Sequence, residues 1–141
     1  MATICVTGSA SGIGAATRAR LESGGHRVIG VDLRDADIVG DLSKKPDRAR
    51  IVAEVSAACG GVLDGLVPCA GVSTPAPNEL VVRVNYFGTL EVVNGLRPCL
   101  EKGTDAAVVM ISSNSTTMTP GLPVAEALAY LERDEESVVA S

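Results

Sequence analysis

The chain has 141 residues, 46% of them hydrophobic and 21% charged, which allows one compact domain with a core and excludes a disordered polyelectrolyte. Twelve basic and seventeen acidic residues give a formal net charge of −5. This balance, with no basic cluster longer than Lys44-Lys45, argues against nucleic acid or an anionic membrane as a partner. Aromatic residues make up 2% of the chain, so we expect Val, Leu, Ile and Ala to build the core.

The sequence contains no apolar run as long as a membrane span, and its N-terminus lacks the basic region of a signal peptide. We therefore expect a cytoplasmic protein. The four cysteines form no Cys-x-x-Cys pair, and His26 is the one histidine of the sequence. We expect free thiols in a reducing compartment and no metal site.

Short β-rich runs alternate with longer helical stretches along the chain. The expected strands are residues 3–6, 27–31, 38–39, 65–67 and 106–111. The expected helices are residues 12–21, 46–58, 80–100 and a short one at about 125–133, before an acidic tail. The run at 106–111 is continuously apolar, which is typical of a strand buried on both faces. The alternation predicts βαβ units and a parallel sheet.

Residues 80–100 form the longest helical candidate. Apolar side chains recur along it with roughly helical spacing, at Val81, Val84, Leu90, Val93 and Leu100. We expect these five side chains to share one face of the helix.

A glycine-rich segment, Thr7 to Gly14, separates the first expected strand from the first expected helix. Gly8 can make the sharp exit from the strand, and Gly12 lets the backbone approach a pyrophosphate. Gly14 lets the helix pack closely on the sheet. Backbone N–H groups and the positive end of the helix dipole would then hold the phosphates, so an acidic protein can still bind an anionic dinucleotide.

Asp32 ends the second expected strand, where an acid can accept hydrogen bonds from both ribose hydroxyls of a dinucleotide. A 2′-phosphate at that place would be repelled by the carboxylate, which favours NAD over NADP. Arg34 is a nearby guanidinium that could partly accommodate such a phosphate. The alternative explanation of the segment is a helix-capping turn followed by a solvated aspartate.

The spacing Thr7-Gly8-x-x-x-Gly12-x-Gly14 resembles the cofactor fingerprint of the short-chain dehydrogenase/reductase family. Four further blocks resemble that family in the same order: Asp41-Leu42, Cys69-Ala70-Gly71, residues 84–88 (VNYFG) and residues 111–113 (ISS). The resemblance covers residues 1 to about 115. Within that family, the sequence of these motifs resembles the bacterial subgroup of hydroxysteroid dehydrogenases and carbonyl reductases.

The resemblance implies an α/β fold, a Rossmann-type doubly wound parallel sheet with helices on both faces that is truncated after the fifth strand. It implies a dinucleotide-binding core at residues 1–115, with residues 116–141 as an insertion with a short helix in the same domain. It also implies NAD as cofactor and a small-molecule alcohol or ketone as substrate. The intact protein would be a dimer or tetramer.

The resemblance also assigns roles to individual residues. Ser113 would orient the substrate oxygen, and Asn85 would support a water-linked proton relay and brace its helix. Each residue also has a structural explanation. Ser113 would then be a strand-end serine that bonds to the backbone, and Asn85 a helix amide that bonds to neighbouring backbone. The implied cofactor-binding residues are Gly8, Ser11, Gly12, Ile13, Asp32, Leu33, Asp41, Leu42, Cys69, Ala70 and Gly71.

The sequence departs from the family pattern at two places. Pro68-Cys69 replaces Asn-Asn, and because proline lacks an N–H we expect a loss of bracing between strands but no loss of cofactor binding. We expect Cys69 to be a packing residue. The Tyr-x-x-x-Lys pair that supplies the family's proton donor is absent from the 141 residues, since Tyr130 has Asp134 four residues later.

Three functions therefore stay open. The intact protein would be an oxidoreductase that interconverts a secondary alcohol and a ketone, a hydroxysteroid or other carbonyl compound, by hydride transfer with NAD(H). A Tyr-x-x-x-Lys pair would then follow Ser141. If the chain ends at Ser141, it would be a non-catalytic NAD-binding module. A structural protein with a vestigial glycine loop is the third alternative, and Asp32→Ala would change none of its activities.

Overall fold

The computed structural model describes residues 1–121 and 123–141. The chain divides into two compact units, Met1–Met110 and Ile111–Ser141. The first unit contains a sheet and the helices that cover it, and the second contains three short helices. The predicted organisation, a core at residues 1–115 and an insertion at 116–141 in the same domain, stays a prediction. Leu122 of that insertion lies outside the described residues.

The sheet of the first unit is fully parallel, with the strand order β3-β2-β1-β4-β5. Its strands are β1 Thr3–Thr7, β2 Arg27–Asp32, β3 Ile38–Val39, β4 Gly65–Pro68 and β5 Ala107–Val108. Because β1 is followed along the chain by β2 on one side and later by β4 on the other, the order reverses at β1. A crevice at the carboxyl ends of β1 and β4 is the usual ligand site in such a sheet.

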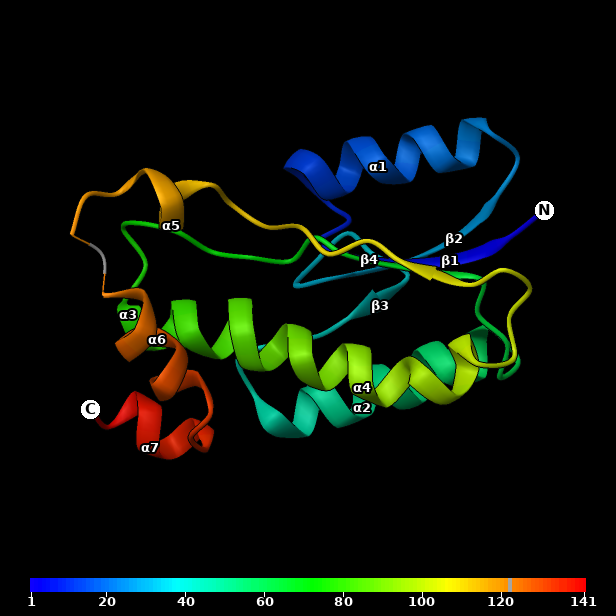
Figure 1. Ribbon diagram of the computed structural model, residues 1–141. Helices are drawn as coiled ribbons and strands as arrows, with labels where there is room; N and C mark the ends of the chain where they lie inside the picture. The colour runs from blue at the N-terminus through cyan, green and yellow to red at the C-terminus, as the bar shows by residue number, and fades with distance from the viewer. Residues whose placement is uncertain (122) are drawn as a thin grey trace. The chain divides into compact units, whose positions relative to one another are not determined.

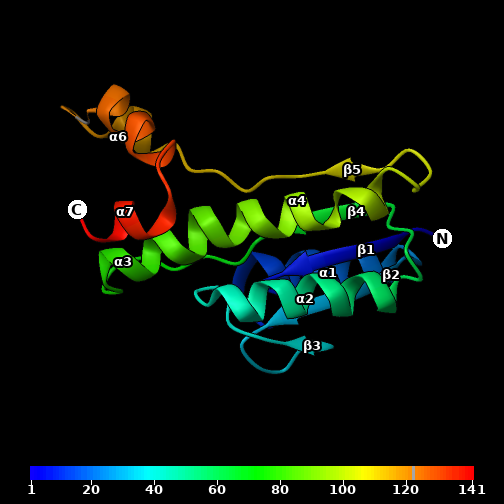
Figure 2. The same cartoon turned by 90° about the horizontal axis from the view of Figure 1, so that it is seen from below.

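Helices cover both faces of the sheet. Helix α1 (Gly12–Ser23) lies on one face, and α2 (Lys45–Ala58) and α4 (Thr89–Leu100) lie side by side on the other (Figures 1 and 2). Pro46 occupies the first turn of α2, where its missing N–H removes no helical hydrogen bond. The predicted doubly wound Rossmann-type architecture is confirmed.

An aliphatic core joins the strands to α2 and α4. Its members are Ile29, Val31, Ile38, Leu42, Ile51, Val55, Leu63, Leu66, Val84, Val92 and Leu96, together with the thiols of Cys5 and Cys99. Burial raises the pKa of the Cys5 thiol to about 12, so at neutral pH this side chain is a protonated, apolar core residue. All four cysteines are free thiols.

The predicted long helix is continuous from Asn78 to Leu100 but changes its winding on the way. Helix α3 (Asn78–Val81) passes into a π-helical segment, η1 (Val82–Gly88), and then into α4. A π-helical turn takes up more residues than an α-helical one, so it rotates the faces of everything that follows. The buried face of α4 is therefore Val92, Leu96 and Cys99, whereas Leu90 is 41% exposed. The predicted placement of Leu90 on the same face as Val84 is wrong: six residues of an α-helix turn through about 600°, which leaves the two side chains about 120° apart, and the π-helical segment between them changes that angle further.

The apolar run at residues 106–111 does not form the expected strand buried on both faces. Strand β5 consists of two residues, both exposed, and Val109 and Met110 after it are 55% and 54% exposed. Burial on both faces requires elements packed above and below the strand, and the exposure of both β5 residues shows that its faces are not covered in this way. Among the described residues β5 pairs with β4 alone, at the edge of the sheet. The sequence pattern correctly predicts that a strand lies in this run, but it wrongly predicts the length of the strand and its burial.

The second unit contains α5 (Ser115–Met118), α6 (Val124–Leu131) and α7 (Glu135–Val139). Helix α6 matches the predicted short helix. The residues expected to be an acidic tail form α7, because Asp134 caps it by accepting hydrogen bonds from the N–H and the hydroxyl of Ser137, at 3.0 and 2.6 Å. Across the described part of the chain, every helix is too short or too polar to span a membrane.

Candidate functional site

A cavity of about 390 Å³ opens at the carboxyl ends of β1, β2 and β4. The structure brings together in its lining all eleven of the residues that sequence reasoning assigned to a cofactor, although they come from four separate segments. These are Gly8, Ser11, Gly12, Ile13, Asp32, Leu33, Asp41, Leu42, Cys69, Ala70 and Gly71. This cavity is the candidate site.

The three glycines of the loop between β1 and α1 differ in what surrounds them. Gly8 has φ +68°, and a Cβ there would lie 2.8 Å from the Cα of Ala70. A Cβ at Gly14 would overlap the carbonyl oxygen of Gly8 and lie 2.6 Å from its carbonyl carbon, so the first turn of α1 packs directly on the loop. Gly12 has φ +53°, and a Cβ there would meet nothing within 4 Å, so this glycine leaves room beside the cavity.

Asp32 fixes the glycine loop to the end of β2. Its carboxylate accepts hydrogen bonds from the N–H of Ala10 at 2.9 Å and from the N–H of Leu33 at 2.7 Å. An ionised carboxylate has about four lone-pair sites, so acceptor capacity is left for a ligand. Arg34, the residue considered as a partner for a 2′-phosphate, is exposed and lies outside the cavity lining.

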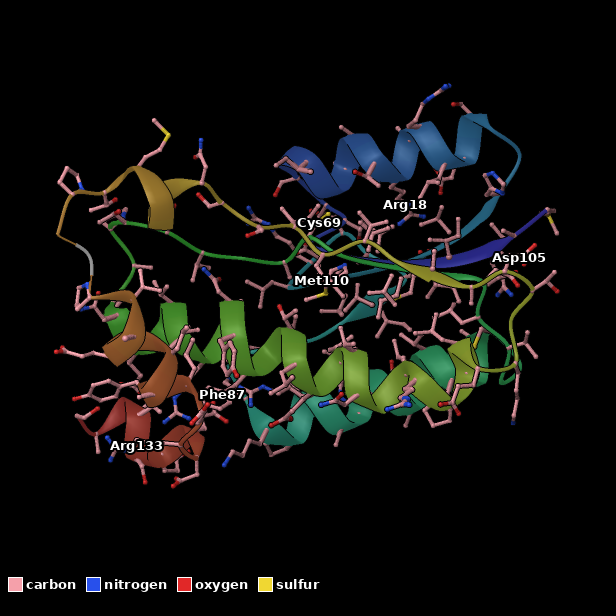
Figure 3. All side chains as sticks on the ribbon, viewed as in Figure 1. Arg18, Cys69, Phe87, Asp105, Met110 and Arg133 are labelled. Atoms are coloured by element: carbon pink, nitrogen blue, oxygen red, sulfur yellow. The ribbon has the colours of Figure 1, made fainter. Side chains whose placement is uncertain are left out.

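The chain after Asp32 is held by an ion pair between Asp37 and Arg18. Asp37 accepts a hydrogen bond from the N–H of Gly30 at 2.7 Å and pairs with the guanidinium of Arg18 at 3.1 Å. Arg18 lies between α1 and the sheet (Figure 3). A Cβ at Gly30 would overlap its guanidinium, so the small residue in β2 makes room for this ion pair. Asp37 thus joins the two ends of residues 30–37, the segment that includes Leu33, and the ion pair with Arg18 ties that segment to α1.

Asp41 begins the turn that continues the lining after β3. Its carboxylate accepts hydrogen bonds from the N–H and the hydroxyl of Ser43, at 2.9 and 2.7 Å, and Lys44 Nζ lies 3.6 Å away. Burial acts to raise the pKa of Asp41, but the hydrogen bonds from Ser43 and the charge of Lys44 outweigh it and lower the pKa. The carboxylate is therefore ionised at neutral pH.

Strands β1 and β4 are tied together at the cavity floor by Thr7, in spite of Pro68. The carbonyl of Thr7 accepts a hydrogen bond from the N–H of Cys69 at 3.2 Å, and its hydroxyl accepts one from the N–H of Ala70 at 3.1 Å. Thr7 is 1% exposed. Sequence reasoning expected a loss of bracing here and did not consider this hydroxyl, whose position in the glycine motif was the available signal.

Cys69 lies at the end of β4 and faces α1 (Figure 3). Burial raises the pKa of its thiol, and a hydrogen bond with Thr17 offsets part of that effect. A protonated thiol is a poor nucleophile. The side chain is therefore a packing residue of the cavity wall.

Asn85 braces the cavity from the π-helical segment. Its side-chain amide donates to the carbonyl of Val72 and accepts from the N–H of Val72, each at 2.8 Å. This pair of bonds fixes the segment Gly71–Val72, which lines the cavity. The amide is thus bonded to neighbouring backbone, and its role in a proton relay stays a prediction. Single π-helical turns are common next to functional sites.

Ser113 belongs to the second unit. Its hydroxyl donates to the hydroxyl of Ser115 at 3.0 Å and accepts from the N–H of Ser115 at 3.2 Å, which forms a local turn at the start of α5. The structure thus describes a local role for this hydroxyl. Its role in orienting a substrate oxygen stays a prediction.

Six further residues of the lining were not assigned to the cofactor. Gly14 was assigned to helix packing, and Val84 begins a block that had been singled out. Three others directly adjoin such a block, which was the available signal, whereas Leu80 had none. The six are Gly14, Val31, Gly40, Val72, Leu80 and Val84. Among the described residues, no group of three or more His, Cys, Asp or Glu side chains could hold a metal ion.

A family model described as short chain dehydrogenase matches residues 2–127 of this sequence. The chain belongs to the short-chain dehydrogenase family. It is 47% identical over 115 residues to the 3-alpha-hydroxysteroid dehydrogenase/carbonyl reductase of Comamonas testosteroni, covering 80% of this chain and 44% of that protein. It is 34% identical over 116 residues to the coniferyl-alcohol dehydrogenase of Pseudomonas sp. (strain HR199 / DSM 7063), covering 78% and 43%.

Solved structures of short-chain dehydrogenases agree with this assignment. The 3-alpha-hydroxysteroid dehydrogenase from Pseudomonas sp. B-0831, complexed with NADH, superposes with a TM-score of 0.89 at 47% identity, over 98% of this chain and 55% of that one. A short-chain dehydrogenase from Brucella ovis, in complex with a partially ordered NAD, gives a TM-score of 0.74 at 25% identity, over 92% and 73%. The chain spans less than half the length of the two curated relatives named above.

Proposed function

We propose that this chain forms the cofactor site of an NAD-dependent oxidoreductase that interconverts a secondary alcohol and a ketone. The observation that carries the proposal is the cavity itself. It gathers a glycine loop, the N-terminus of α1 and the carboxylate of Asp32 at the carboxyl ends of adjacent parallel strands. These are the groups that a dinucleotide requires for its pyrophosphate and its ribose.

The residues of the lining divide by the part of NAD that each would hold. Ser11, Gly12 and Ile13 stand at the start of α1, whose first turn carries no acidic residue, so its dipole would attract the pyrophosphate. Asp32 would accept hydrogen bonds from the ribose hydroxyls. The turn at Asp41 and Leu42 would flank the adenine, as the family resemblance implies.

The same carboxylate favours NAD over NADP. A 2′-phosphate beside Asp32 would place two anionic groups together in a partly buried site, which costs binding energy. The relatives support this choice of cofactor, because one structure 47% identical to this chain is a complex with NADH. When bound, NAD supplies the hydride acceptor for oxidation of the carbinol carbon.

The substrate class follows from the relatives. The family matches include a hydroxysteroid dehydrogenase/carbonyl reductase and a coniferyl-alcohol dehydrogenase, which supports an alcohol or carbonyl compound as substrate. In this proposal Ser113 hydrogen-bonds the substrate oxygen, and Asn85 supports proton transfer through water. The intact enzyme would be a dimer or tetramer. The free thiols fit a reducing compartment such as the cytoplasm.

The proposal is tested first by binding. Calorimetric titration of the protein as its gene encodes it should show a 1:1 complex with NADH. Asp32→Ala removes the charged hydrogen bonds to the ribose, so the variant should bind NADH roughly tenfold more weakly or worse. Glu101→Gln is the matched control, because Glu101 is an exposed acid that pairs with Arg97 on α4. Absence of NADH binding by the unaltered protein would overturn the proposal.

Turnover is tested second. The protein should reduce NAD when given a 3α-hydroxysteroid or a smaller secondary alcohol, and the accompanying rise in absorbance of NADH measures the rate. Tight NADH binding without turnover on any alcohol or ketone would instead identify a non-catalytic NAD-binding module. If Asp32→Ala changes the result of no assay, the remaining explanation is a structural protein with a vestigial glycine loop.

A further inference from the structure

One charged side chain of the first unit is completely buried. Arg48, in α2, is 0% exposed. Its Nε donates to the carbonyl of Leu42 at 2.6 Å, one Nη donates to the carbonyl of Arg83 at 2.9 Å, and the other pairs with Glu91 at 3.0 Å. Burying a guanidinium is costly unless its donors are satisfied, so contacts such as these are needed to hold the charge at this place.

The two backbone acceptors belong to the two segments that meet at one end of the cavity. Leu42 is a lining residue in the turn after β3, and Arg83 lies in the π-helical segment η1 directly before the lining residue Val84. Arg48 therefore bridges the turn to the helix. It does so from behind, because Arg48 itself is not a lining residue of the cavity.

Gly88 brings the same two segments into contact. A Cβ at Gly88 would lie 3.0 Å from the carbonyl oxygen of Leu42 and 3.1 Å from that of Arg83. The carbonyl of Leu42 thus comes close to η1 at Gly88, beside the carbonyl of Arg83 in the same helix, and the guanidinium donates to both carbonyls. The carbonyl of Leu42, if it lost the Arg48 donor in this buried place, would cost free energy.

Few side chains can make this arrangement. A guanidinium presents five N–H donors in a planar fork, which lets one group serve two carbonyls and a carboxylate at once. A lysine ammonium carries the same charge as a point and cannot span the three acceptors with the same geometry. The fork thereby sets the position of Leu42 relative to η1.

We propose that Arg48 is a positioning residue for the adenine end of the cofactor: it holds the Leu42 turn against η1 and thereby keeps the adenine side of the cavity formed. The inference rests on the proposed function, which places adenine beside Asp41 and Leu42. It differs from a role in general stability because it concerns one end of the cavity. Ligands that carry adenine should depend on Arg48, and ligands without it should not.

The test compares three ligands on one variant, in the protein as its gene encodes it. Arg48→Met keeps much of the side-chain volume and removes all its donors. We expect NADH and AMP to bind roughly tenfold more weakly, since each loses a site held by charged hydrogen bonds. Reduced nicotinamide mononucleotide, which lacks the adenosine, should bind within about twofold of the unaltered protein because the phosphate loop is untouched.

Two controls separate the explanations. Arg97→Met removes a 75% exposed arginine paired with Glu101, and should change binding of none of the three ligands. Equal weakening of all three ligands by Arg48→Met, or no weakening, would overturn the proposal. Circular dichroism establishes that each variant is folded at the temperature of the titration.

A second variant guards against loss of folding. Arg48→Lys keeps the charge but not the fork, and should show the same selective loss for NADH and AMP to a smaller extent. If neither variant folds, Arg48 serves the core as a whole and the positioning role is wrong. Failure of the unaltered protein to bind NADH or AMP would contradict the proposed function itself, and is recognised without any variant.

Discussion

Substituting alanine at two glycines of the same loop is expected to affect different properties, stability at one and NADH binding at the other. Gly14→Ala would drive its Cβ into the Gly8 carbonyl, so we expect the free energy of unfolding to fall by about 2–3 kcal/mol. Gly12→Ala meets no atom within 4 Å and costs only the left-handed backbone, about 1 kcal/mol. Because the added methyl would stand where a pyrophosphate must approach, Gly12→Ala should nevertheless weaken NADH binding at least tenfold, by rough estimate.

Urea unfolding and NADH titration of both variants check this separation. The reverse pattern, with Gly12→Ala the less stable variant or Gly14→Ala equally stable to the unaltered chain, would contradict the assignment of Gly14 to packing and Gly12 to the ligand.

Asp41 predicts a dependence of stability on pH. Its pKa is lowered in the folded state by Ser43 and Lys44 against the effect of burial. A carboxyl with a lowered folded pKa stabilises the fold above its unfolded pKa, and the contribution is lost as pH falls through the folded value. Stability should therefore decline below about pH 4, the usual range of an aspartate.

Asp41→Asn removes this contribution, so the loss of stability between neutral pH and about pH 3 should be smaller in the variant. Ser43→Ala, which deletes one of the hydrogen bonds to the carboxylate, should shift the acid transition toward higher pH. Urea titrations at a series of pH values measure both effects. Superimposable pH profiles for the three proteins would show that Asp41 carries no such linkage.

At the scale of elements, the packing of α2 against α4 depends on a close approach at one glycine. A Cβ at Gly95 would lie 2.7 and 2.8 Å from the two methyl groups of Val52, a branched side chain with little freedom to move. We expect Gly95→Ala to lower the free energy of unfolding by about 1–2 kcal/mol, even though alanine gains about 1 kcal/mol of helix propensity.

A double-mutant cycle with Val52→Ala tests the cause. If the clash with Val52 is responsible, the double variant should be more stable than the sum of the two single changes predicts. Additive effects would mean that Gly95 matters for a reason other than this contact.

The sequence predicts the elements well where local pattern decides them. The alternation of strands and helices, the glycine loop and Asp32 at the end of β2 all follow from spacing and residue type. The π-helical segment does not, because VNYFG has no local signal for a wider turn. The predicted helical phase also fails at Leu90, which lies six residues after Val84 and so is not a whole number of α-helical turns away from it. The burial of Arg48 also cannot be predicted from the sequence. An arginine in a helix with several charged residues is expected to be solvent-exposed, and only its tertiary contacts show that it is buried.

At the scale of the whole molecule, the exposed edge at β5 is the feature most open to unwanted association. Among the described residues β5 pairs on one side only, and Val109 and Met110 beyond it are more than half exposed. We expect the 141-residue chain by itself to self-associate as its concentration rises, because an unpaired edge and exposed apolar side chains favour pairing.

Sedimentation velocity over a range of concentrations measures this association. Val109→Lys should reduce it without changing the circular dichroism spectrum, whereas Ala53→Lys, on the exposed side of α2, should leave it unchanged. A monomer at all concentrations would contradict the prediction.

The cavity lining ends, along the chain, at Val84. Every residue of this lining is therefore synthesised before the rest of η1 and before α4. Because chains emerge from the ribosome at about 5–20 residues per second and N-terminal regions fold first, the growing polypeptide carries every residue of the lining before its synthesis is finished. A ligand that binds the folded form stabilises it by mass action. In a nascent chain, the cofactor would thus act as a folding aid before it acts as a reagent.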